Sequence, residues 1–405
     1  MRFCMVTTFY PPHSFGGDGV FVRRLAHALA RRGHEVEILY GQGAFEALGD
    51  GGRREAGPEP DGVSVRPLAR AAGRLGLLLD HQLGRPVLEN RALAAALRRG
   101  GFDVIHFHNI SLAGGPGLLR HGEALKLCTL HDYWFVCPMH VLWRLDREPC
   151  SRRTCLRCTL AGRRPPQLWR RTGAVAGAAR CVDAFLAPSE LSRRLHGVHG
   201  FPAPIQCLPH FALPPPAGGP EVSERPYFLS VGRLEKLKGV QVLLKVFRSY
   251  RGADLVLAGT GGYEPELRRM AADLPHVRFL GWVGEERLAR LYRGALAVVV
   301  PSLCFETFGL VPVEAFAARI PAVVPAGGAL AEVVAGGGGL LYQDEDELAQ
   351  LLAALQDRPE WRRGLGEAGY RNYLENYTEE IHLQRYFALI GELSRARARA
   401  GEGAA

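Results

Sequence analysis

Short apolar segments alternate with amphipathic helical segments along almost the whole chain, and this alternation constrains the fold more than any other feature. In the first half the apolar runs are strand-sized, and the segments between them place apolar residues at helical spacing. Strands joined by helices form parallel sheets with helices on both faces. We expect strands at 3–8, 35–40, 63–67, 103–107, 125–130, 184–188 and 205–208, with helices at 20–32 and 88–99.

The second half repeats this pattern after a stretch rich in Pro and Gly at 212–226, which is typical of a domain linker. The sequence therefore predicts an α/β protein with two Rossmann-like doubly wound domains, 1–211 and 227–375, that face a cleft and bind ligands at the carboxyl ends of their strands. Residues 376–405 are expected to form a C-terminal helix that returns to the N-terminal domain and ends in a frayed tail. Further strands are expected at 227–231, 254–258, 277–280, 297–300 and 322–324, and helices at 240–250, 264–272, 285–292, 311–318, 345–355 and 383–395.

The composition excludes several classes of protein. The chain of 405 residues is 47% hydrophobic and 22% charged, as soluble globular proteins are. No apolar run approaches the roughly 18 residues that a transmembrane helix needs. The N-terminal apolar run ends at Pro11 and is too short for a signal peptide, so we expect a cytoplasmic protein. Residues 1–220 hold 28 Lys and Arg against 17 Asp and Glu, a balance that attracts anionic partners.

The segment PSLCFETFGLVPVE, at 301–314, carries two carboxylates eight residues apart. Glu306 is expected in a loop after a strand, and Glu314 in the helix that follows. The first free N–H groups of that helix, from Gly309 to Val311, would form an anion site. Carboxylates repel phosphate, so the pair is better suited to accept hydrogen bonds from sugar and ribose hydroxyls. The alternative is a solvated Glu306 and a Glu314 that caps the helix.

Two further loops follow expected strands. SVGRLEKLKG, at 230–239, places Arg233 and Lys238 between a strand and a helix, where cations suit a diphosphate. Ordinary surface charge is the alternative. AGTGG, at 258–262, adds a Gly-x-Gly pattern that is weak evidence by itself.

Together these segments resemble glycosyltransferase family 4. The resemblance rests on SVGRLEKLKG, FLGWVGEERLARLY, PSLCFETFGLVPVEAFA and the N-terminal GGDGVFVRRLAHALARRGHEVEIL, and it covers roughly residues 2–390 in the family's order. It implies the GT-B fold, with the donor held mainly by the C-terminal domain. It also implies transfer of a hexosyl group from a nucleotide-sugar, with retention of the anomeric configuration and without a catalytic metal.

The resemblance assigns roles to individual residues. Arg233 and Lys238 would hold the donor diphosphate and stabilise the leaving group, because charge builds on the departing phosphate. Glu306 would bind donor-sugar hydroxyls and Glu314 the ribose. The other implied donor contacts are Val283 at the base, Phe308, Gly309 and Leu310 at the sugar and phosphate, and Gly16 and Gly17 near the diphosphate and acceptor.

Three histidines need separate treatment. The resemblance places His131, in LHDYW, near the donor sugar as a catalytic residue, with a structural role as the alternative. His106 and His108, in IHFHN, are expected to point to opposite sides of a strand, so that they do not share a ligand. The sequence departs from the family at Arg319, where glycine is usual, and this puts the local turn in doubt.

Four cysteines cluster in an insert at about 134–180, with the spacing C-x12-C-x4-C-x2-C. Four thiols suit a tetrahedral structural zinc, which would stabilise a segment without a clear core. The alternatives are a redox pair, an iron–sulfur cluster or unlinked thiols, and His140 could replace one ligand. The predicted ligands are Cys137, Cys150, Cys155 and Cys158.

The same insert is basic, with ten Arg against two acids between residues 144 and 180, and Trp134, Trp143 and Trp169 lie in or beside it. Arg with Trp suits a membrane interface, and nucleic acid is the other anionic partner. Our hypothesis is peripheral contact with an anionic membrane, at the inner face of the cell membrane, and no nucleic-acid binding.

The sequence thus predicts a retaining glycosyltransferase of surface polysaccharide or glycolipid synthesis. Its partners would be a nucleotide-sugar donor and a glycan or polyprenyl-diphosphate-linked acceptor. One alternative is a nucleotide-sugar epimerase or hydrolase on the same fold, because a fold does not fix the chemistry. Another is a zinc-stabilised nucleic-acid-binding or scaffold protein, which would have no need of the charged residues in the two loops.

Overall fold

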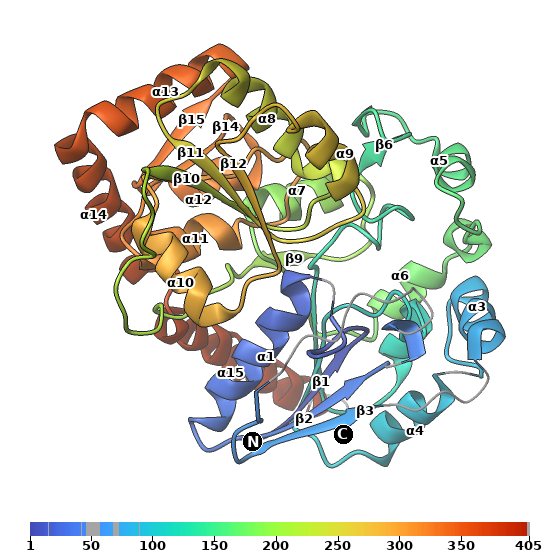
Figure 1. Cartoon of the computed structure of the whole chain (residues 1–405). Helices are drawn as coiled ribbons and strands as arrows, with labels where there is room; N and C mark the ends of the chain where they lie inside the picture. Colours follow the sequence, from blue (N-terminus) through green and yellow to red (C-terminus); the bar gives the residue numbers. More distant parts are fainter. Residues whose placement is uncertain (15, 42, 46–56, 68–72, 89, 403–405) are drawn as a thin grey trace. The chain divides into compact units, whose positions relative to one another are not determined.

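Two parallel sheets, each in its own structural unit, form the centre of the computed structural model (Figure 1). The structure describes residues 1–14, 16–41, 43–45, 57–67, 73–88 and 90–402. The first unit contains Met1–Leu208 and Gln384–Ala405, and the second contains Pro209–Leu383. The α/β class with parallel sheets is the class that the sequence predicts.

The sheet of the first unit has the order β3-β2-β1-β4-β5-β8-β9, and every neighbouring pair is parallel. The chain reverses direction across the sheet between β1 and β4, which is the topological switch point of a doubly wound fold. The strands are β1 (Arg2–Thr7), β2 (Glu35–Tyr40), β3 (Val63–Pro67), β4 (Val104–Phe107), β5 (Leu125–Thr129), β8 (Ala184–Ala187) and β9 (Ile205–Cys207).

Helices and a hairpin complete this unit. The α-helices are α1 (Gly17–Ala30), α3 (Gly73–Leu83), α4 (Arg91–Arg99), α5 (Cys155–Ala161), α6 (Ala174–Ala179), α7 (Glu190–Val198) and the end of α15 (Glu379–Glu402). Two 3-10 helices, η1 (Pro116–Arg120) and η2 (Leu168–Arg171), and the hairpin β6 (Trp143–Arg144) with β7 (Glu148–Pro149) lie between them. α5, η2, β6 and β7 all belong to the insert.

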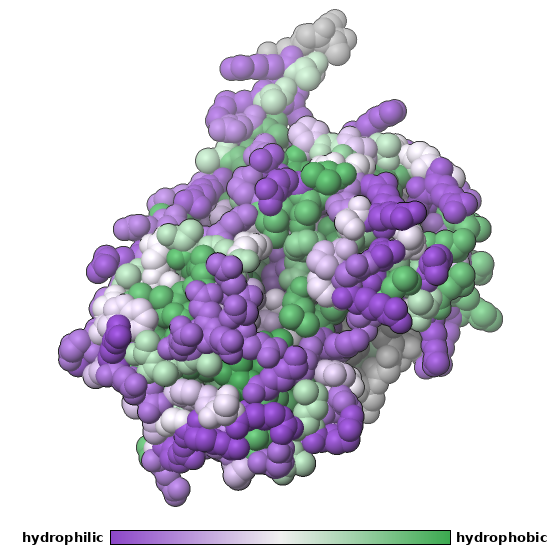
Figure 2. All heavy atoms as spheres, turned by 90° about the horizontal axis from the view of Figure 1, so that it is seen from above, coloured by the Kyte–Doolittle hydropathy of each residue, from purple (hydrophilic) through white to green (hydrophobic). Residues whose placement is uncertain are grey.

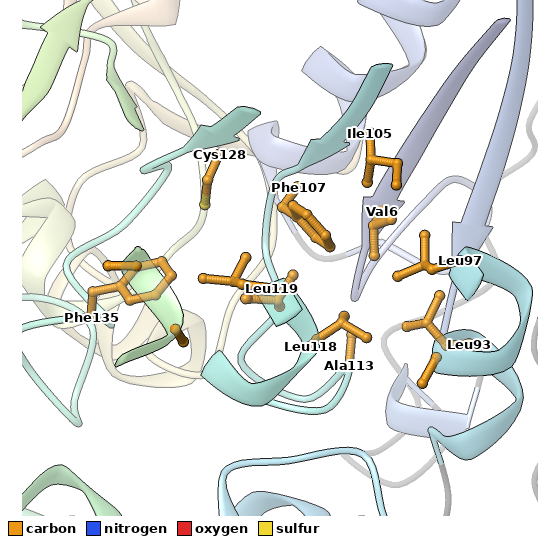
Figure 3. Close-up of a cluster of buried hydrophobic side chains, with 14 of the residues drawn as sticks. Val6, Leu93, Leu97, Ile105, Phe107, Ala113, Leu118, Leu119, Cys128 and Phe135 are labelled. Atoms are coloured by element: carbon orange, nitrogen blue, oxygen red, sulfur yellow. The ribbon is translucent and has the colours of Figure 1, made fainter. Parts of the chain in front are cut away.

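The alternation of side chains along β1 divides the core into two layers. Cys4 and Val6 pack with Leu97 of α4 in the cluster that Figure 3 shows. Phe3 points to the other face and stacks on Tyr386 of α15, with ring centroids 6.3 Å apart. Both faces of the strand are buried, which explains why its sequence is apolar without interruption.

The sheet of the second unit has the order β12-β11-β10-β13-β14-β15, again with parallel neighbours and with its switch point between β10 and β13. The strands are β10 (Tyr227–Val231), β11 (Asp254–Ala258), β12 (Val277–Gly281), β13 (Val298–Val299), β14 (Ala322–Pro325) and β15 (Gly339–Tyr342). The helices are η3 (Lys236–Lys238), α8 (Val240–Ser249), α9 (Glu264–Met270), α10 (Glu285–Gly294), α11 (Leu310–Ala317), α12 (Gly328–Val334), α13 (Glu345–Asp357) and α14 (Pro359–Asn376).

Several elements differ from the sequence-based expectation. The structure adds α3, α12, β15 and α14, which the periodicity did not single out. α4 begins at Arg91 and not at residue 88, and the side chain of Asn90, just before the helix, donates to Asp80 at 3.0 Å. α15 continues through residues 396–402, which were expected to be frayed. None of the helices among the described residues is long and apolar enough to cross a bilayer.

Candidate active site

Two loops of the second unit lie side by side at the switch point of its sheet. One follows β10 and contains Lys238, and the other follows β13 and contains Glu306. The backbone N–H of Leu303 donates to the carbonyl of Leu237 at 2.9 Å. At Gly239 the backbone has a φ of +74°, and a Cβ atom would lie 1.9 Å from the carbonyl oxygen of Pro301. Only glycine allows this approach, so the glycine holds the two loops together.

The contact between these loops brings a cation and a carboxylate together. The Lys238 Nζ donates to Glu306 Oε1 at 2.6 Å, and the Ser302 hydroxyl donates to the same oxygen at 2.6 Å. Burial alone would raise the pKa of Glu306, but the charge and hydrogen bond of Lys238, the Ser302 hydroxyl and the charge of Arg233 outweigh it and lower that pKa. Burial likewise opposes the charge of Lys238, yet Glu306 raises its pKa. Both groups are therefore charged at neutral pH.

Arg233 is exposed in the same loop as Lys238. Its charge reaches both members of the pair, because it lowers the pKa of Glu306 and opposes the protonation of Lys238. The structure thus brings together the three charged residues that the sequence singled out in these loops. Two cations and one carboxylate leave a net positive charge at the switch point, which suits an anionic ligand.

Glu314 lies in α11, the helix that follows the second loop. The Tyr292 hydroxyl of α10 donates to Glu314 Oε2 at 2.9 Å and orients the carboxylate. At the start of α11, Gly309 packs so tightly that a Cβ atom would lie 3.0 Å from a methyl of Leu330. The side chain of Phe308 is buried, so only its backbone is available to a ligand. Leu310 is the first residue of the helix, and Val283 is partly buried between β12 and α10.

In the first unit, Gly16 and Gly17 lie at the start of α1, after β1 and at the switch point of that sheet. A Cβ atom at Gly17 would meet no other atom within 4 Å, so this position does not require glycine on steric grounds. Gly19 does require it, because a Cβ atom there would lie 2.6 Å from the Ser14 hydroxyl. Asp18, beside it, accepts a hydrogen bond from the Asn109 side chain at 3.2 Å.

The expectation for His106 and His108 was wrong. Residues two apart on a strand point to the same face, and their ring centroids are 4.0 Å apart. His106 makes hydrogen bonds with Tyr386 and Thr129. His108 instead reaches the residue that the sequence singled out, because its Nδ1 lies 2.9 Å from the Nε2 of His131.

This contact fixes the tautomers of both rings. The His108 Nε2 lies 3.3 Å from the sulfur of Met5, which can only accept, so this nitrogen carries the proton. In a neutral ring Nδ1 is then the acceptor, and the Nε2–H of His131 donates to it. Burial lowers the pKa of His131 against the opposing charges of Asp18 and Asp132. The lowered pKa keeps the His131 ring neutral at neutral pH, and both histidines line a small pocket.

Comparison with known proteins identifies the family. Residues 15–212 match Glycosyltransferase Family 4, and residues 217–372 match Glycosyl transferases group 1. The MMP alpha-(1->4)-mannosyltransferase of Mycolicibacterium hassiacum is 30% identical over 398 residues, which cover 90% of this chain and 91% of that protein. The chain belongs to glycosyltransferase family 4. As a member of this family it is an enzyme, a glycosyltransferase.

Solved structures show that this family 4 glycosyltransferase has the GT-B-like fold. The structure of sucrose-phosphate synthase from Thermosynechococcus elongatus has a TM-score of 0.74 at 20% identity, and the match covers 99% of this chain and 100% of that chain. The structure of Anabaena HepE in complex with UDP-glucose has a TM-score of 0.65 at 17% identity, over 98% of this chain and 100% of that chain.

The departure from the family at Arg319 has a structural explanation. Arg319 follows α11 with a φ of +60°, the conformation in which glycine is usual. Its guanidinium lies 3.7 Å from the ring centroid of Tyr370 and pairs with Glu367, both on α14. These contacts offset the cost of the left-handed conformation, about 1 kcal/mol. The turn of this family 4 glycosyltransferase is therefore kept without the glycine.

The four cysteines of the insert lie in one neighbourhood. Burial raises the pKa of Cys150, and so do the charges of Cys137, Cys155 and Cys158. Within the described residues, however, no three His, Cys, Asp or Glu side chains are arranged so as to hold a metal ion. His140 is paired with Asp132 at 2.8 Å. Structural zinc in this glycosyltransferase stays a prediction, which metal analysis of the purified protein would test.

Two of the three tryptophans in or beside the insert are too buried to contact a membrane. Trp134 and Trp169 are buried, and the guanidinium of Arg170 lies 5.2 and 4.7 Å from the centroids of their rings. Burial lowers the pKa of Arg170 to about 10, so it stays charged between the two rings. This part of the enzyme is a core with a cation–π centre, and Trp143 is half-buried at the start of β6.

Sequence reasoning missed several residues of this family 4 glycosyltransferase that position the candidate site. Ser302 and Tyr292 hold the two carboxylates, Gly239 closes the loops, and His108 orients His131. A signal existed for His108, because it follows β4 directly and lies two residues after His106, the spacing of side chains on one face of a strand. Ser302 lies four residues before Glu306 in the same loop, whereas Tyr292 comes from α10, a separate element that no local pattern connects with Glu314.

Proposed function

We propose that the protein transfers a hexosyl group from a nucleotide-sugar to a glycan or lipid-linked saccharide, with retention of the anomeric configuration. The observation that carries this proposal is the group of Arg233, Lys238 and Glu306 at the switch point of the second sheet. Its net positive charge matches a diphosphate, whose negative charge grows as the bond to the sugar breaks. The UDP-glucose in the HepE structure supports a nucleoside-diphosphate sugar as the donor class.

In the proposed reaction the bond between the donor's C1 and the diphosphate oxygen breaks, and the acceptor oxygen bonds to C1 from the same face. The proton of the acceptor hydroxyl passes to the departing phosphate oxygen. Arg233 and Lys238 stabilise the charge on that phosphate, and Glu306 keeps Lys238 in place while it accepts hydrogen bonds from the sugar. No metal takes part in this mechanism.

The remaining residues bind the two substrates in this proposal. Glu314, oriented by Tyr292, accepts hydrogen bonds from the ribose, and the backbone around Gly309 contacts the sugar and phosphate. In the first unit, the neutral ring of His131 accepts a hydrogen bond from a sugar hydroxyl through Nδ1. The glycine loop at the start of α1 contacts the diphosphate and the acceptor.

The acceptor in this proposal is a glycan or a polyprenyl-diphosphate-linked saccharide, used in surface polysaccharide or glycolipid synthesis. The enzyme would meet it at the inner face of the cell membrane, in the cytoplasm. The first half of this chain has the basic balance that an anionic surface attracts, which supports contact with the membrane.

A thermal-shift screen against UDP-, GDP-, ADP- and TDP-sugars tests the donor site. A ligand that binds the folded state raises the melting temperature. We expect one nucleotide to raise it, and we expect Arg233→Ala and Glu314→Ala to abolish the shift. The absence of any shift, in protein shown by circular dichroism to be folded, would overturn the assignment of the donor site.

A second candidate function on the same fold is hydrolysis or epimerisation of the nucleotide-sugar. Product analysis separates the two. Incubation of the donor with a panel of saccharide acceptors should give a glycoside with the donor's anomeric configuration by NMR. Free sugar or an epimerised donor in equal yield with and without acceptors would favour the second candidate.

A further inference from the structure

Helix α3 presents its leucines to solvent, which is the reverse of an ordinary surface helix. Leu75 is 75% exposed, and Leu78, Leu79 and Leu83 are each 43–45% exposed. Their spacing, i, i+3, i+4 and i+8, places them on one face of the helix. The inward face holds Leu77 and little other apolar surface.

Polar contacts hold this helix in place, so its leucines are not needed for packing. Asp80 is buried and accepts hydrogen bonds from the backbone N–H groups of Val87, Leu88 and Asn90 at 2.8–2.9 Å. The indole N–H of Trp169, in η2, donates to the carbonyl of His81 at 2.9 Å. These contacts fix which face of α3 points outward.

Neighbouring segments extend the apolar face. Leu168 of η2, which adjoins Trp169, is 66% exposed, and Leu88 after α3 is 42% exposed. On α5, Leu156 and Leu160 are 47% and 59% exposed. Figure 2 shows hydrophobic side chains gathered along one edge of the molecule, the edge at which α3 and α5 lie in Figure 1. We call the exposed leucines of α3 together with Leu168 the leucine face.

The two described segments that carry the leucine face, 73–88 and 160–173, have a strong excess of positive charge. In 73–88 the only acid is Asp80, which is buried, and 160–173 contain no acid at all. Five arginines in these two segments are exposed, namely Arg74, Arg85, Arg163, Arg164 and Arg171. Burial lowers the pKa of His81 to about 4, so the positive charge does not depend on a histidine near neutral pH.

We propose that the leucine face and its arginines dock the enzyme onto an anionic lipid bilayer. Leucines entering the boundary between headgroups and acyl chains, with arginines at the phosphates, are the arrangement of an interfacial helix. The proposal rests on the membrane contact proposed above and names the surface that makes it. An anionic bilayer suits this face because the two segments that carry the leucines expose five arginines, while the one acid within 73–88 and 160–173, Asp80, is buried.

Co-sedimentation of the full chain with phosphatidylcholine vesicles, with and without phosphatidylglycerol, tests the proposal. We expect binding that needs the anionic lipid and weakens with salt. The double variant Leu75→Glu/Leu79→Glu should reduce the bound fraction at least about tenfold, because it removes apolar contact and adds negative charge. Arg74→Glu/Arg171→Glu should do the same through charge alone.

The matched control is Leu374→Glu, which changes a leucine of α14 that is 46% exposed, in the other unit, and it should bind as the wild type does. Wild type that stays unbound at low salt would overturn the proposal, as would a leucine variant that binds normally. Dissociation of a dimer by the leucine variant, with vesicle binding unchanged, would assign the face to a second copy instead. Donor binding without vesicles should be equal in all variants, so failure of the donor site and failure of this proposal are distinguishable.

Discussion

Gly239→Ala is the substitution that most directly tests how the donor loops are assembled. The new methyl group would lie 1.9 Å from the carbonyl oxygen of Pro301 and 2.8 Å from its carbon. An ordinary contact between carbon and oxygen is about 3.3 Å or longer, so the loops must separate by roughly 1.4 Å. The separation acts directly between Lys238 and Glu306, because these residues lie in the two loops.

The magnitude follows from two separate effects. The left-handed conformation costs an alanine about 1 kcal/mol in stability wherever it occurs. A displacement of about 1 Å in a group that stabilises the transition state costs on the order of 100-fold in rate. That loss corresponds to about 2.7 kcal/mol in activation free energy. We therefore expect a fall of about 100-fold in kcat/KM, beyond what the loss of stability explains.

Gly33→Ala is the matched control. Gly33 has a φ of +77°, almost equal to that of Gly239, but a Cβ atom there would meet nothing within 4 Å. Gly33→Ala measures how much melting temperature the left-handed conformation alone costs an alanine, and only Gly239→Ala should also lose donor affinity and sugar transfer. Calorimetric titration with the nucleotide and a transfer assay measure these quantities. A folded Gly239→Ala enzyme that transfers sugar within about threefold of wild type would refute the reasoning.

Three further predictions follow from the geometry. Glu306→Gln should lower the rate of sugar transfer by about 10- to 100-fold, which corresponds to the free energy of one hydrogen bond to a charged group. The affinity for the nucleotide alone should change less. An equal loss in the transfer assay and in nucleotide binding would contradict this prediction. Tyr292→Phe removes one hydrogen bond that orients the carboxylate of Glu314, and it should weaken nucleoside-diphosphate binding about two- to tenfold in calorimetry, with unchanged binding as the contrary result. Burial lowers the pKa of His81 and His131, so the unfolded chain binds protons at these rings more readily than the folded chain does. The free energy of unfolding should therefore be complete above about pH 6.5 and fall below it by up to about 1.4 kcal/mol per pH unit for each ring. A urea-unfolding midpoint that stays constant down to pH 5 would contradict the sign.

Most of the parallel strands were predictable because they contain a short run of apolar residues. A strand buried on both faces leaves a clear local signal, as in β1 and β10, and the switch points follow from the chain order once the strands are known. Helix α3 was not predictable in this way, because four of its leucines are exposed and its position depends on a contact with Trp169, which is distant in the sequence. The exposure of a helix face is a tertiary property that helical spacing does not reveal.

The charged residues of the candidate site were also predictable, because they occupy loops after strands and such loops meet at one edge of a parallel sheet. Their partners were not. The pairing of Lys238 with Glu306 depends on the close approach at Gly239, and the link from His108 to His131 spans two strands. In the insert the sequence misled in the opposite direction. Its Arg and Trp residues are typical of an interface, but Trp134 and Trp169 pack around Arg170 in a core.

The first unit contains residues from both ends of the chain, so it can be completed only after the C-terminal helix has been synthesised. Tyr386, which stacks on Phe3 and bonds to His106, emerges from the ribosome only after the whole second unit. At about 5–20 residues per second, the second unit delays it by roughly 10–35 s. During that interval the nascent chain exposes an unfinished apolar face of β1 and β4. We therefore expect chaperones to bind mainly the N-terminal half of the enzyme, although that half is translated first and has the longest time to fold.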